Sequence, residues 1–292
     1  MVDHRRFAPD NIRTFTVTQP DTLLAFLLQA IAPAKRTTVK NLLRIGSVAI
    51  NDTPTTQFDR PLNPGDRVGV NLTRPFVVFN HRRLKLVYED DDIIVVDKGY
   101  GLLSVGTGKN KEETAYDIMK DYLKRKNPAN KIFVVHRLDR DTSGLMMFAK
   151  NPKAKEAMQH NWNNMVLSRK YIAVVEGRPE PAEGTLRSYL LQNSAMEVYS
   201  VDEPQEGARL AVTRYKTLKS AGGYSWMELE LDTGRKNQIR VHMRDLGTPI
   251  AGDRKYGART GPFKRMALHA RTLRFIHPTT RKAMDFESRA PF

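Results

Sequence analysis

Two aspartates, two arginines and a histidine are concentrated in residues 136–141 (HRLDRD), between two apolar runs of the stretch VVHRLDRDTSGLMMFAK. A strand that ends here would place these charges in a loop, and loops often carry chemistry. A carboxylate such as Asp139 can act as a nucleophile or remove a proton, and a nearby cation favours its ionised form. The alternative interpretation is structural: Asp139 forms a turn and is balanced by Arg137 and Arg140.

Two later stretches are similarly rich in polar and cationic side chains, SRKY at 168–171 and TGRKNQIRVH at 233–242. An aspartate, a tyrosine and an arginine from separate segments can meet in one basic cleft. There we expect Arg240 to pair with Asp139 and to keep this carboxylate ionised.

The balance of charges favours a polyanionic partner. The chain has 292 residues, with 48 Lys and Arg against 32 Asp and Glu, a formal net charge of +16 and a pI of about 10.0. Such a surface points to nucleic acid. The hydrophobic fraction of 40% is sufficient for a folded core. The absence of cysteine excludes disulfides, thiolate metal sites and a thiol nucleophile.

Several other functions lack their sequence signatures. The stretch GLLSVGTGKN lacks the glycine spacing and the final Ser or Thr of a phosphate-binding loop, and LDTG, the start of an aspartic-protease signature, occurs in a single copy. The seven histidines show no paired metal-ligand spacing, and no Gly-x-Gly-x-x-Gly motif follows a strand. We therefore expect no metal, no nucleotide cofactor and no other cofactor.

The chain also lacks the segments that direct proteins to membranes. Its start, MVDHRR, has no apolar signal core, and its apolar runs fall short of the ~18 residues of a spanning helix. A cytoplasmic protein that does not enter a membrane is expected.

The first part of the chain has the pattern of a small α/β domain. We expect a flexible arm over 1–15, a compact domain over 16–72 and a linker over 73–83. Helices are predicted at 21–31 and 37–46 from their apolar runs and end signals.

The second of these helices carries a basic face. Arg36, Lys40 and Arg44 recur every four residues and share one side of the helix, away from an apolar side. This face either contacts phosphates or is only solvated, and the net charge of +16 makes the two interpretations equally good.

Residues 84–292 have the pattern of a large α+β domain. Strand-like segments cluster in neighbouring pairs and are predicted at 84–88, 93–96, 171–175, 209–217, 224–232 and 268–276. Helices are predicted at 114–123, 152–165 and 236–246. Because few helices separate the strands, a mixed, mostly antiparallel sheet is favoured over a doubly wound parallel one.

Four stretches of this larger domain are long and distinctive: HRLDRDTSGLMMFAK, RKYIAVVEG, TGRKNQIRVHMRDLGTPIAGDRKYG and LHARTLRFIHP. In this order and at these separations they resemble the signatures of the RluA family of RNA pseudouridine synthases. Residues 16–72 resemble a small RNA-binding module shared with a small-subunit ribosomal protein and some tRNA synthetases. The chain departs from the family at Gly99, where proline is usual, and at Lys236-Asn237, where Thr-His is frequent.

The resemblance implies the isomerisation of uridine to pseudouridine in RNA without a cofactor. It implies that Asp139 starts glycosidic cleavage as nucleophile or base, that Arg240 positions it, and that Tyr171 packs on the uracil and assists removal of the carbon 5 proton. The reacting uridine must leave its stack. By the same resemblance Arg137 takes the vacated position, and Leu268 lines the uracil pocket.

Further RNA contacts are expected at basic residues of several segments: Arg36, Lys40, Arg44, Lys170 and Arg235. Large-subunit ribosomal RNA is the favoured substrate, because front modules of this kind commonly accompany ribosomal RNA enzymes of the family, and tRNA is the alternative. Two other classes are a non-catalytic RNA-binding or ribosome assembly protein and an RNA methyltransferase. The three key residues argue against the first, and the lack of a methyl-donor loop argues against the second.

Overall fold

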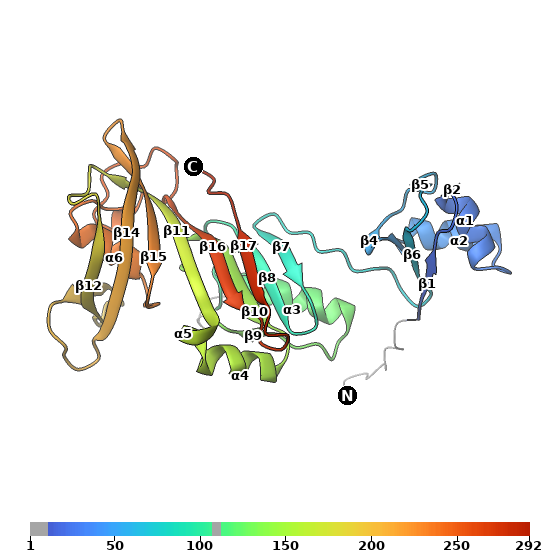
Figure 1. Ribbon diagram of the computed structural model, residues 1–292, viewed down its shortest axis with the longest axis horizontal. Helices are drawn as coiled ribbons and strands as arrows, with labels where there is room; N and C mark the ends of the chain where they lie inside the picture. Colours follow the sequence, from blue (N-terminus) through green and yellow to red (C-terminus); the bar gives the residue numbers. More distant parts are fainter. Residues whose placement is uncertain (1–10, 107–111) are drawn as a thin grey trace. The chain divides into compact units, whose positions relative to one another are not determined.

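The computed structural model describes residues 11–106 and 112–292 and divides the chain into two compact units (Figure 1). The smaller unit holds the described residues up to Phe79 together with Tyr122–Asn130, and the larger unit holds the rest of the described chain. Each unit has its own sheet and its own apolar core.

The smaller unit is built from a four-stranded sheet with strand order β1-β6-β3-β4, two helices, and a short ribbon formed by β2 and β5. Its elements are β1 (Ile12–Thr16), β2 (Asp21–Thr22), α1 (Leu23–Ala30), α2 (Arg36–Arg44), β3 (Val48–Ile50), β4 (Thr53–Pro54), β5 (Pro61–Leu62) and β6 (Arg67–Asn71). The apolar sides of both helices pack with the sheet in one core.

The predicted arm over 1–15 is wrong from Ile12 onward, because β1 pairs antiparallel with β6. Phe15 packs against the core and meets Phe26 edge to face, with ring centroids 6.5 Å apart. The other β1 side chains are exposed. An edge strand anchored by one side chain shows little apolar alternation, which is why its sequence looks like an arm. Residues 1–10 of the predicted arm lie outside the described residues.

The second helix has the two sides that its sequence predicts. Val39, Leu42 and Leu43 are buried, whereas Arg36, Lys40 and Arg44 are exposed. Gly46 follows the helix with φ +77°, a left-handed conformation that costs glycine little because it lacks a Cβ. The three cations are therefore presented together to solvent.

The larger unit contains an 11-stranded sheet whose main path runs β13-β12-β14-β15-β11-β16-β10-β8-β7. Its strands are β7 (Leu84–Glu89), β8 (Ile93–Lys98), β9 (Phe133–Val134), β10 (Ser143–Ala149), β11 (Val166–Glu176), β12 (Glu183–Gln192), β13 (Val198–Val201), β14 (Arg209–Ala221), β15 (Tyr224–Leu231), β16 (Leu268–Ile276) and β17 (Ala283–Glu287). The pairings are antiparallel except that of β10 with β16, which is parallel. This confirms the predicted mixed, mostly antiparallel sheet.

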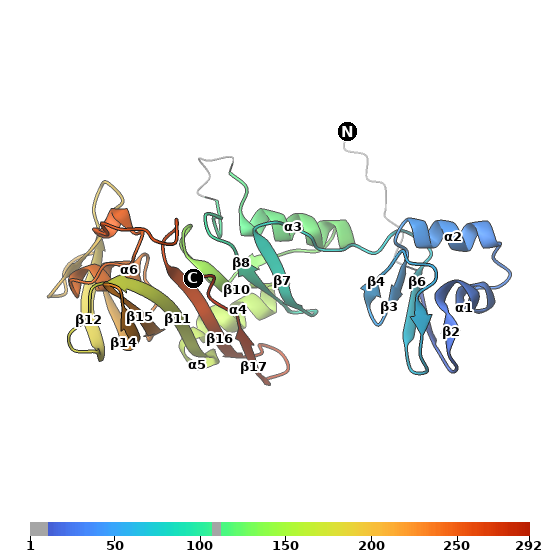
Figure 2. The same cartoon turned by 90° about the horizontal axis from the view of Figure 1, so that it is seen from above.

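Helices cover both faces of the centre of this sheet (Figure 2). They are α3 (Ala115–Lys126), of which the part up to Asp121 belongs to this unit, α4 (Pro152–His160) and α5 (Trp162–Met165). A further helix, α6 (Gln238–Asp245), lies beside β13 and β14. Leu145 of β10 shares a core cluster with Met158 of α4, whereas Phe148 contacts Tyr116 of α3 with ring centroids 6.4 Å apart. Alternate side chains of β10 therefore pack against helices on opposite faces of the sheet. Within the described chain, no helix combines the length and apolarity needed to cross a membrane.

The structure differs from the sequence expectations at one helix and at three strands of this unit, since β12, β13 and β17 are not predicted. The single helix predicted over 152–165 is divided at Asn161, whose φ of −114° and ψ of 26° interrupt the helical backbone. β12 and β13 were not expected, because most β12 side chains are polar or partly exposed and its alternation is weak. Pairing with β14 over eight residues makes β12 a strand despite this composition.

Candidate active site

A cavity of about 440 Å³ opens in the larger unit, a volume typical of small-ligand pockets, which span roughly 300–1,000 Å³. Its wall combines the loop between β9 and β10, α5, the first half of β11, the segment from the end of β15 into the first turn of α6, and the start of β16. The sequence-predicted residues that line it are Arg137, Asp139, Tyr171, Arg235, Arg240 and Leu268.

The backbone on both sides of Asp139 is held by buried side chains. The Ser104 hydroxyl donates to the Leu138 carbonyl at 2.7 Å and accepts the Leu138 N–H at 3.0 Å. The Lys98 ammonium donates to the Arg140 carbonyl at 3.0 Å. These contacts join the loop to the end of β8 and the segment after it, so the position of Asp139 is set by residues distant in sequence.

Lys98 is a residue that the sequence did not single out. It is fully buried at the end of β8, and its ammonium also donates to the carbonyls of Leu102 at 2.8 Å and Gly99 at 3.1 Å. Burial lowers the pKa of Lys98 to about 7, against the opposing effect of Asp141 and Asp139. Three carbonyl acceptors match the three protons of its ammonium form, so these hydrogen bonds favour the protonated state that burial opposes.

Burial and nearby positive charges shift the pKa of Asp139 in opposite directions. Burial raises the pKa of Asp139, while Arg240, Arg137 and Lys98 lower it in that order, and the backbone N–H of Asn237 lowers it further. The net shift is upward. The cavity thus holds a carboxylate whose charge is only partly compensated, which makes it more basic than an exposed aspartate.

Arg240 does not form the expected pair with Asp139. Its Nε and Nη2 atoms both donate to the carboxylate of Asp253, at 2.7 Å each, in a bidentate pair with side-chain exposures of 10% and 2%. The expectation of a direct pair is therefore wrong: Arg240 acts on Asp139 through the field of its charge. Asp253 was missed because its distance of 13 residues from Arg240 matches no helical or strand spacing.

Asn237 joins the members of this group. It has φ 54° and ψ 17°, the left-handed region in which asparagine is among the more tolerated residues. Its side chain donates to the Tyr256 hydroxyl at 2.9 Å and accepts from Arg240 Nη1 at 3.3 Å. The backbone N–H of the same residue helps to lower the pKa of Asp139. The Lys236-Asn237 departure therefore lies at the centre of the site.

Tyr171 and Leu268 form the less polar part of the wall. Tyr171 lies on β11 between Leu229 of β15 and Ala270 of β16, and it is 8% exposed. Burial raises the pKa of Tyr171, Arg169 lowers it and Asp139 raises it again. The phenol is therefore neutral at physiological pH. A planar, mostly apolar ring can be received between such groups.

The remaining predicted cations are distributed differently. Arg137 is exposed at the rim, and Arg235 donates from Nε to the Leu210 carbonyl at 2.9 Å. Lys170 alternates with Tyr171 along β11 and pairs with Glu228 at 2.8 Å, so its side chain is not part of the cavity wall. The basic face of α2, formed by Arg36, Lys40 and Arg44, belongs to the smaller unit.

Three further wall residues, His136, Trp162 and Arg169, are not among the predicted site residues. His136 accepts the Met147 N–H at Nε2 over 3.0 Å, and burial lowers the pKa of His136 to about 3, so the imidazole is neutral. Its ring lies against Trp162, with centroids 5.1 Å apart, and the Arg169 guanidinium lies 5.5 Å from the same indole ring. Aromatic and guanidinium planes of this kind can stack on nucleobases.

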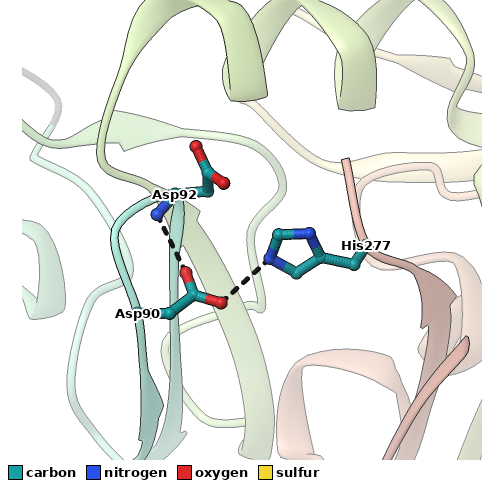
Figure 3. Close-up of side chains that lie close together, drawn as sticks. All are labelled: Asp90, Asp92 and His277. Carbon is teal, nitrogen blue, oxygen red and sulfur yellow. Dashed lines mark hydrogen bonds and ion pairs between the residues drawn. The ribbon is translucent and has the colours of Figure 1, made fainter. Parts of the chain in front are cut away.

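Three possible metal ligands meet elsewhere in this unit, at Asp90, Asp92 and His277 (Figure 3). His277 Nε2 lies 2.9 Å from Asp90, and its Nδ1 accepts the Thr280 N–H at 3.0 Å. The other Asp90 oxygen accepts the N–H groups of Asp92 and Ile93, both at 2.8 Å. Burial raises the pKa of Asp90, and these hydrogen bonds outweigh it and lower the pKa. Hydrogen bonding within the protein accounts for this cluster.

The chain matches a sequence profile described as RNA pseudouridylate synthase over residues 92–245, a segment that contains Asp139, Tyr171 and Arg240. An uncharacterized RNA pseudouridine synthase of Bacillus subtilis is 34% identical over 263 residues, which cover 88% of this chain and 86% of that protein. The ribosomal large subunit pseudouridine synthase D of Haemophilus influenzae is 32% identical over 71% of this chain and 68% of that protein.

A solved structure of a protein with a related name also resembles this chain. The human RNA pseudouridylate synthase domain containing 1 superposes with a TM-score of 0.55 at 27% identity, over 72% of this chain and 84% of that one. The chain therefore belongs to the RNA pseudouridylate synthase family and is an RNA pseudouridine synthase.

Proposed function

We propose that this enzyme converts specific uridines of structured RNA into pseudouridine and that its substrate is large-subunit ribosomal RNA. The observation that carries the proposal is the meeting of Asp139, Tyr171 and Leu268 in one cavity ringed by cations. The preference for this RNA is supported by the Haemophilus influenzae relative, which is named a ribosomal large subunit pseudouridine synthase.

Asp139 is the residue that starts the reaction. The bond between uracil and ribose breaks at the ring nitrogen, the uracil turns in the cavity, and carbon 5 forms a new bond to the same ribose carbon. Carbon 5 then loses its proton, and the freed ring nitrogen takes one up. Because nothing is added or removed overall, the reaction is an isomerisation and needs no group donor. A carboxylate held in place with a raised pKa suits the first step, as nucleophile or as base.

Arg137 and Tyr171 serve the flipped nucleotide. A uridine inside a stacked helix cannot reach the cavity, and extruding it costs a few kcal/mol. Arg137 is exposed at the cavity rim, and its planar guanidinium can stack on the neighbouring bases and bind phosphates where the uridine has left. Tyr171, inside, packs on the uracil and assists removal of the carbon 5 proton.

The smaller unit serves as an RNA-binding module of the kind shared with a small-subunit ribosomal protein. Its support is the exposed basic face of α2, where Arg36, Lys40 and Arg44 are held by a helix whose other side is in the core. Phosphate contacts made by such a face add affinity without reading sequence.

The catalytic proposal is tested with Asp139→Asn. Tritium release from carbon-5-labelled uridine in RNA is expected to fall to the background rate. Because burial raises the pKa of Asp139, the ionised carboxylate costs stability at neutral pH, and the variant should be no less stable than the parent. Full activity in this stable variant would remove Asp139 from the reaction.

The substrate is tested by mapping pseudouridine in total RNA of a strain that lacks the gene. One or more sites in large-subunit ribosomal RNA should be lost and should return when the parent gene is restored, but not with the Asp139→Asn gene. Loss of sites in tRNA alone would replace the proposed substrate with tRNA.

A further inference from the structure

Three cations lie together at the rim of the active-site cavity. Arg137 and Lys236 contribute to the cavity wall, and Lys255 belongs to the 3₁₀ turn Arg254–Tyr256. All three residues are exposed. Lys236 lies in one of the two places where the chain departs from its family, and Lys255 is not among the residues that the sequence predicts for the site.

The fold holds the two lysines close to each other. Asn237, which directly follows Lys236, donates from its side chain to the Tyr256 hydroxyl at 2.9 Å. The Lys255 ammonium lies 6.0 Å from the centroid of the Tyr256 ring. Asn237 and Tyr256 are both buried, so the two lysines are attached to backbone that packing keeps in place.

The charges of this group act on one another. Loss of hydration lowers the pKa of Lys236, and the charges of Arg137 and Lys255 lower it further, whereas Asp139 opposes them. Like charges that are held this close repel each other. A bound anion would remove this repulsion, because its own charge attracts all three cations.

The described part of the chain supplies no such anion: within it, none of the three cations forms an ion pair with a carboxylate. Exposed cations on the same loop and on the helix that follows are paired, Arg140 with Glu112 at 3.3 Å and Arg244 with Asp245 at 2.7 Å. The cations at the rim are therefore available to an anion that comes from outside the protein.

A target nucleotide brings an anion to this place. Its ribose must lie at Asp139, because the bond that breaks joins the ribose to the uracil. The two phosphates that flank the nucleotide are attached to the same ribose, so they remain near the cavity rim when the uracil is inside. The lysine ammonium is a compact charge that commonly binds phosphates in proteins.

We propose that Lys236 and Lys255, with the charge of Arg137 beside them, bind one of the two phosphates that flank the target uridine and thereby hold its ribose at Asp139. The inference rests on the proposed function and extends it. Arg137 acts where the uridine has left its stack, whereas the two lysines act on the extruded nucleotide itself.

The test uses pairs of short RNAs built around a uridine that the mapping experiment has identified. The members of a pair differ in one linkage beside that uridine, which is a phosphate in one RNA and an uncharged methylphosphonate in the other. In both RNAs the nucleotide on the 5′ side of this linkage lacks its 2′-hydroxyl, which keeps the neutral linkage intact. One such pair is made for each of the two flanking linkages, and affinity is measured by filter binding.

The parent enzyme is expected to bind the neutral member of one pair about fivefold or more weakly than the charged member. Lys236→Gln combined with Lys255→Gln should bind the two members within about twofold of each other, since the phosphate charge has lost its partners. Both lysines are exposed, so the double variant should unfold at the same temperature as the parent. Lys236→Arg combined with Lys255→Arg keeps both charges and should keep the parent difference.

Lys282→Gln is the matched control. It removes the charge of an exposed lysine in the turn that follows β16, whose last residue is Ile276. The cavity is lined by the opposite end of this strand, at Leu268. The control should therefore keep the parent difference.

Two results overturn the inference: a parent enzyme that distinguishes the members of neither pair, or a double glutamine variant that distinguishes them as strongly as the parent. Failure of the parent enzyme to form pseudouridine in any RNA would instead overturn the proposed function.

Discussion

Arg240 donates two hydrogen bonds of 2.7 Å to Asp253, and both side chains are removed from solvent. This pair fixes the guanidinium beside Asp139 without occupying the Asp139 carboxylate. Tyr256 supports the arrangement, with its ring centroid 4.8 Å from the guanidinium carbon of Arg240. One aspartate thus orients the cation, while the other lines the cavity without forming an ion pair with it.

Replacing Asp253 should damage stability as well as catalysis. Asp253→Asn leaves the Arg240 charge buried without its partner, and we expect a loss of about 3–5 kcal/mol in the free energy of unfolding. Chemical denaturation measures this. Glu287→Gln is the control, since it breaks an exposed pair with Arg271 and should cost about 0–1 kcal/mol. Equal stability of the two variants would contradict the role given to Asp253.

The pH dependence of turnover should report on the cations around Asp139. In the proposed mechanism the carboxylate is the active form, so activity should be lost as pH falls through the pKa of Asp139, which burial raises. Because Arg137 lowers this pKa, Arg137→Gln should move the acidic limb of the single-turnover profile to higher pH. Arg137→Lys keeps the charge and should leave the limb near its original position. If the parent, Arg137→Gln and Arg137→Lys enzymes all have the same acidic limb, a group other than Asp139 controls the pH dependence of turnover.

Tyr171→Phe tests the proton-transfer role. The ring remains and should still pack in the cavity, so RNA affinity should change by less than about threefold, whereas loss of an acid–base group lowers turnover by about 10²–10⁴-fold. Filter binding and tritium release measure the two effects. Normal turnover would leave Tyr171 a packing role only.

The basic face of α2 should contribute through charge. Changing Arg36, Lys40 and Arg44 to Ala should weaken RNA binding and reduce the slope of log affinity against log salt by about two to three, since each phosphate contact contributes roughly 0.7–0.9. The three side chains are exposed, so thermal unfolding should be unaffected. Arg36→Lys combined with Arg44→Lys retains the charge and should retain the slope. An unchanged slope in the alanine variant would show a face that is only solvated.

Gly144 should tolerate no side chain. It has φ +113°, and a Cβ there would lie 2.6 Å from the backbone nitrogen of Ala270 on β16. Gly144→Ala should therefore lower the free energy of unfolding by at least about 3 kcal/mol, from backbone strain and overpacking together. Gly222→Ala, at φ +60° with open space around it, should cost about 1–2 kcal/mol. Similar urea-unfolding midpoints for Gly144→Ala and Gly222→Ala would contradict the close approach of Gly144 to the backbone of Ala270.

The elements best predicted from sequence are those whose own periodicity defines them. β16 occupies the predicted 268–276, and α2 has the predicted opposition of apolar and basic sides. The sequence predicts an arm where β1 lies and no strand at β12, because an edge or weakly patterned strand is defined mainly by its partner. Pairing partners are set by the whole sheet, which local pattern does not describe.

The active site divides in the same way. The residue types and their motifs single out Asp139, Tyr171 and Arg240 as candidates, and the structure places all three in the wall of one cavity. The partner of Arg240, the carbonyls around Lys98 and the outward side of Lys170 depend on which segments the fold brings together. Hydrogen bonds and ion pairs act over a few ångströms between residues far apart in the chain, so only folding determines which of them form.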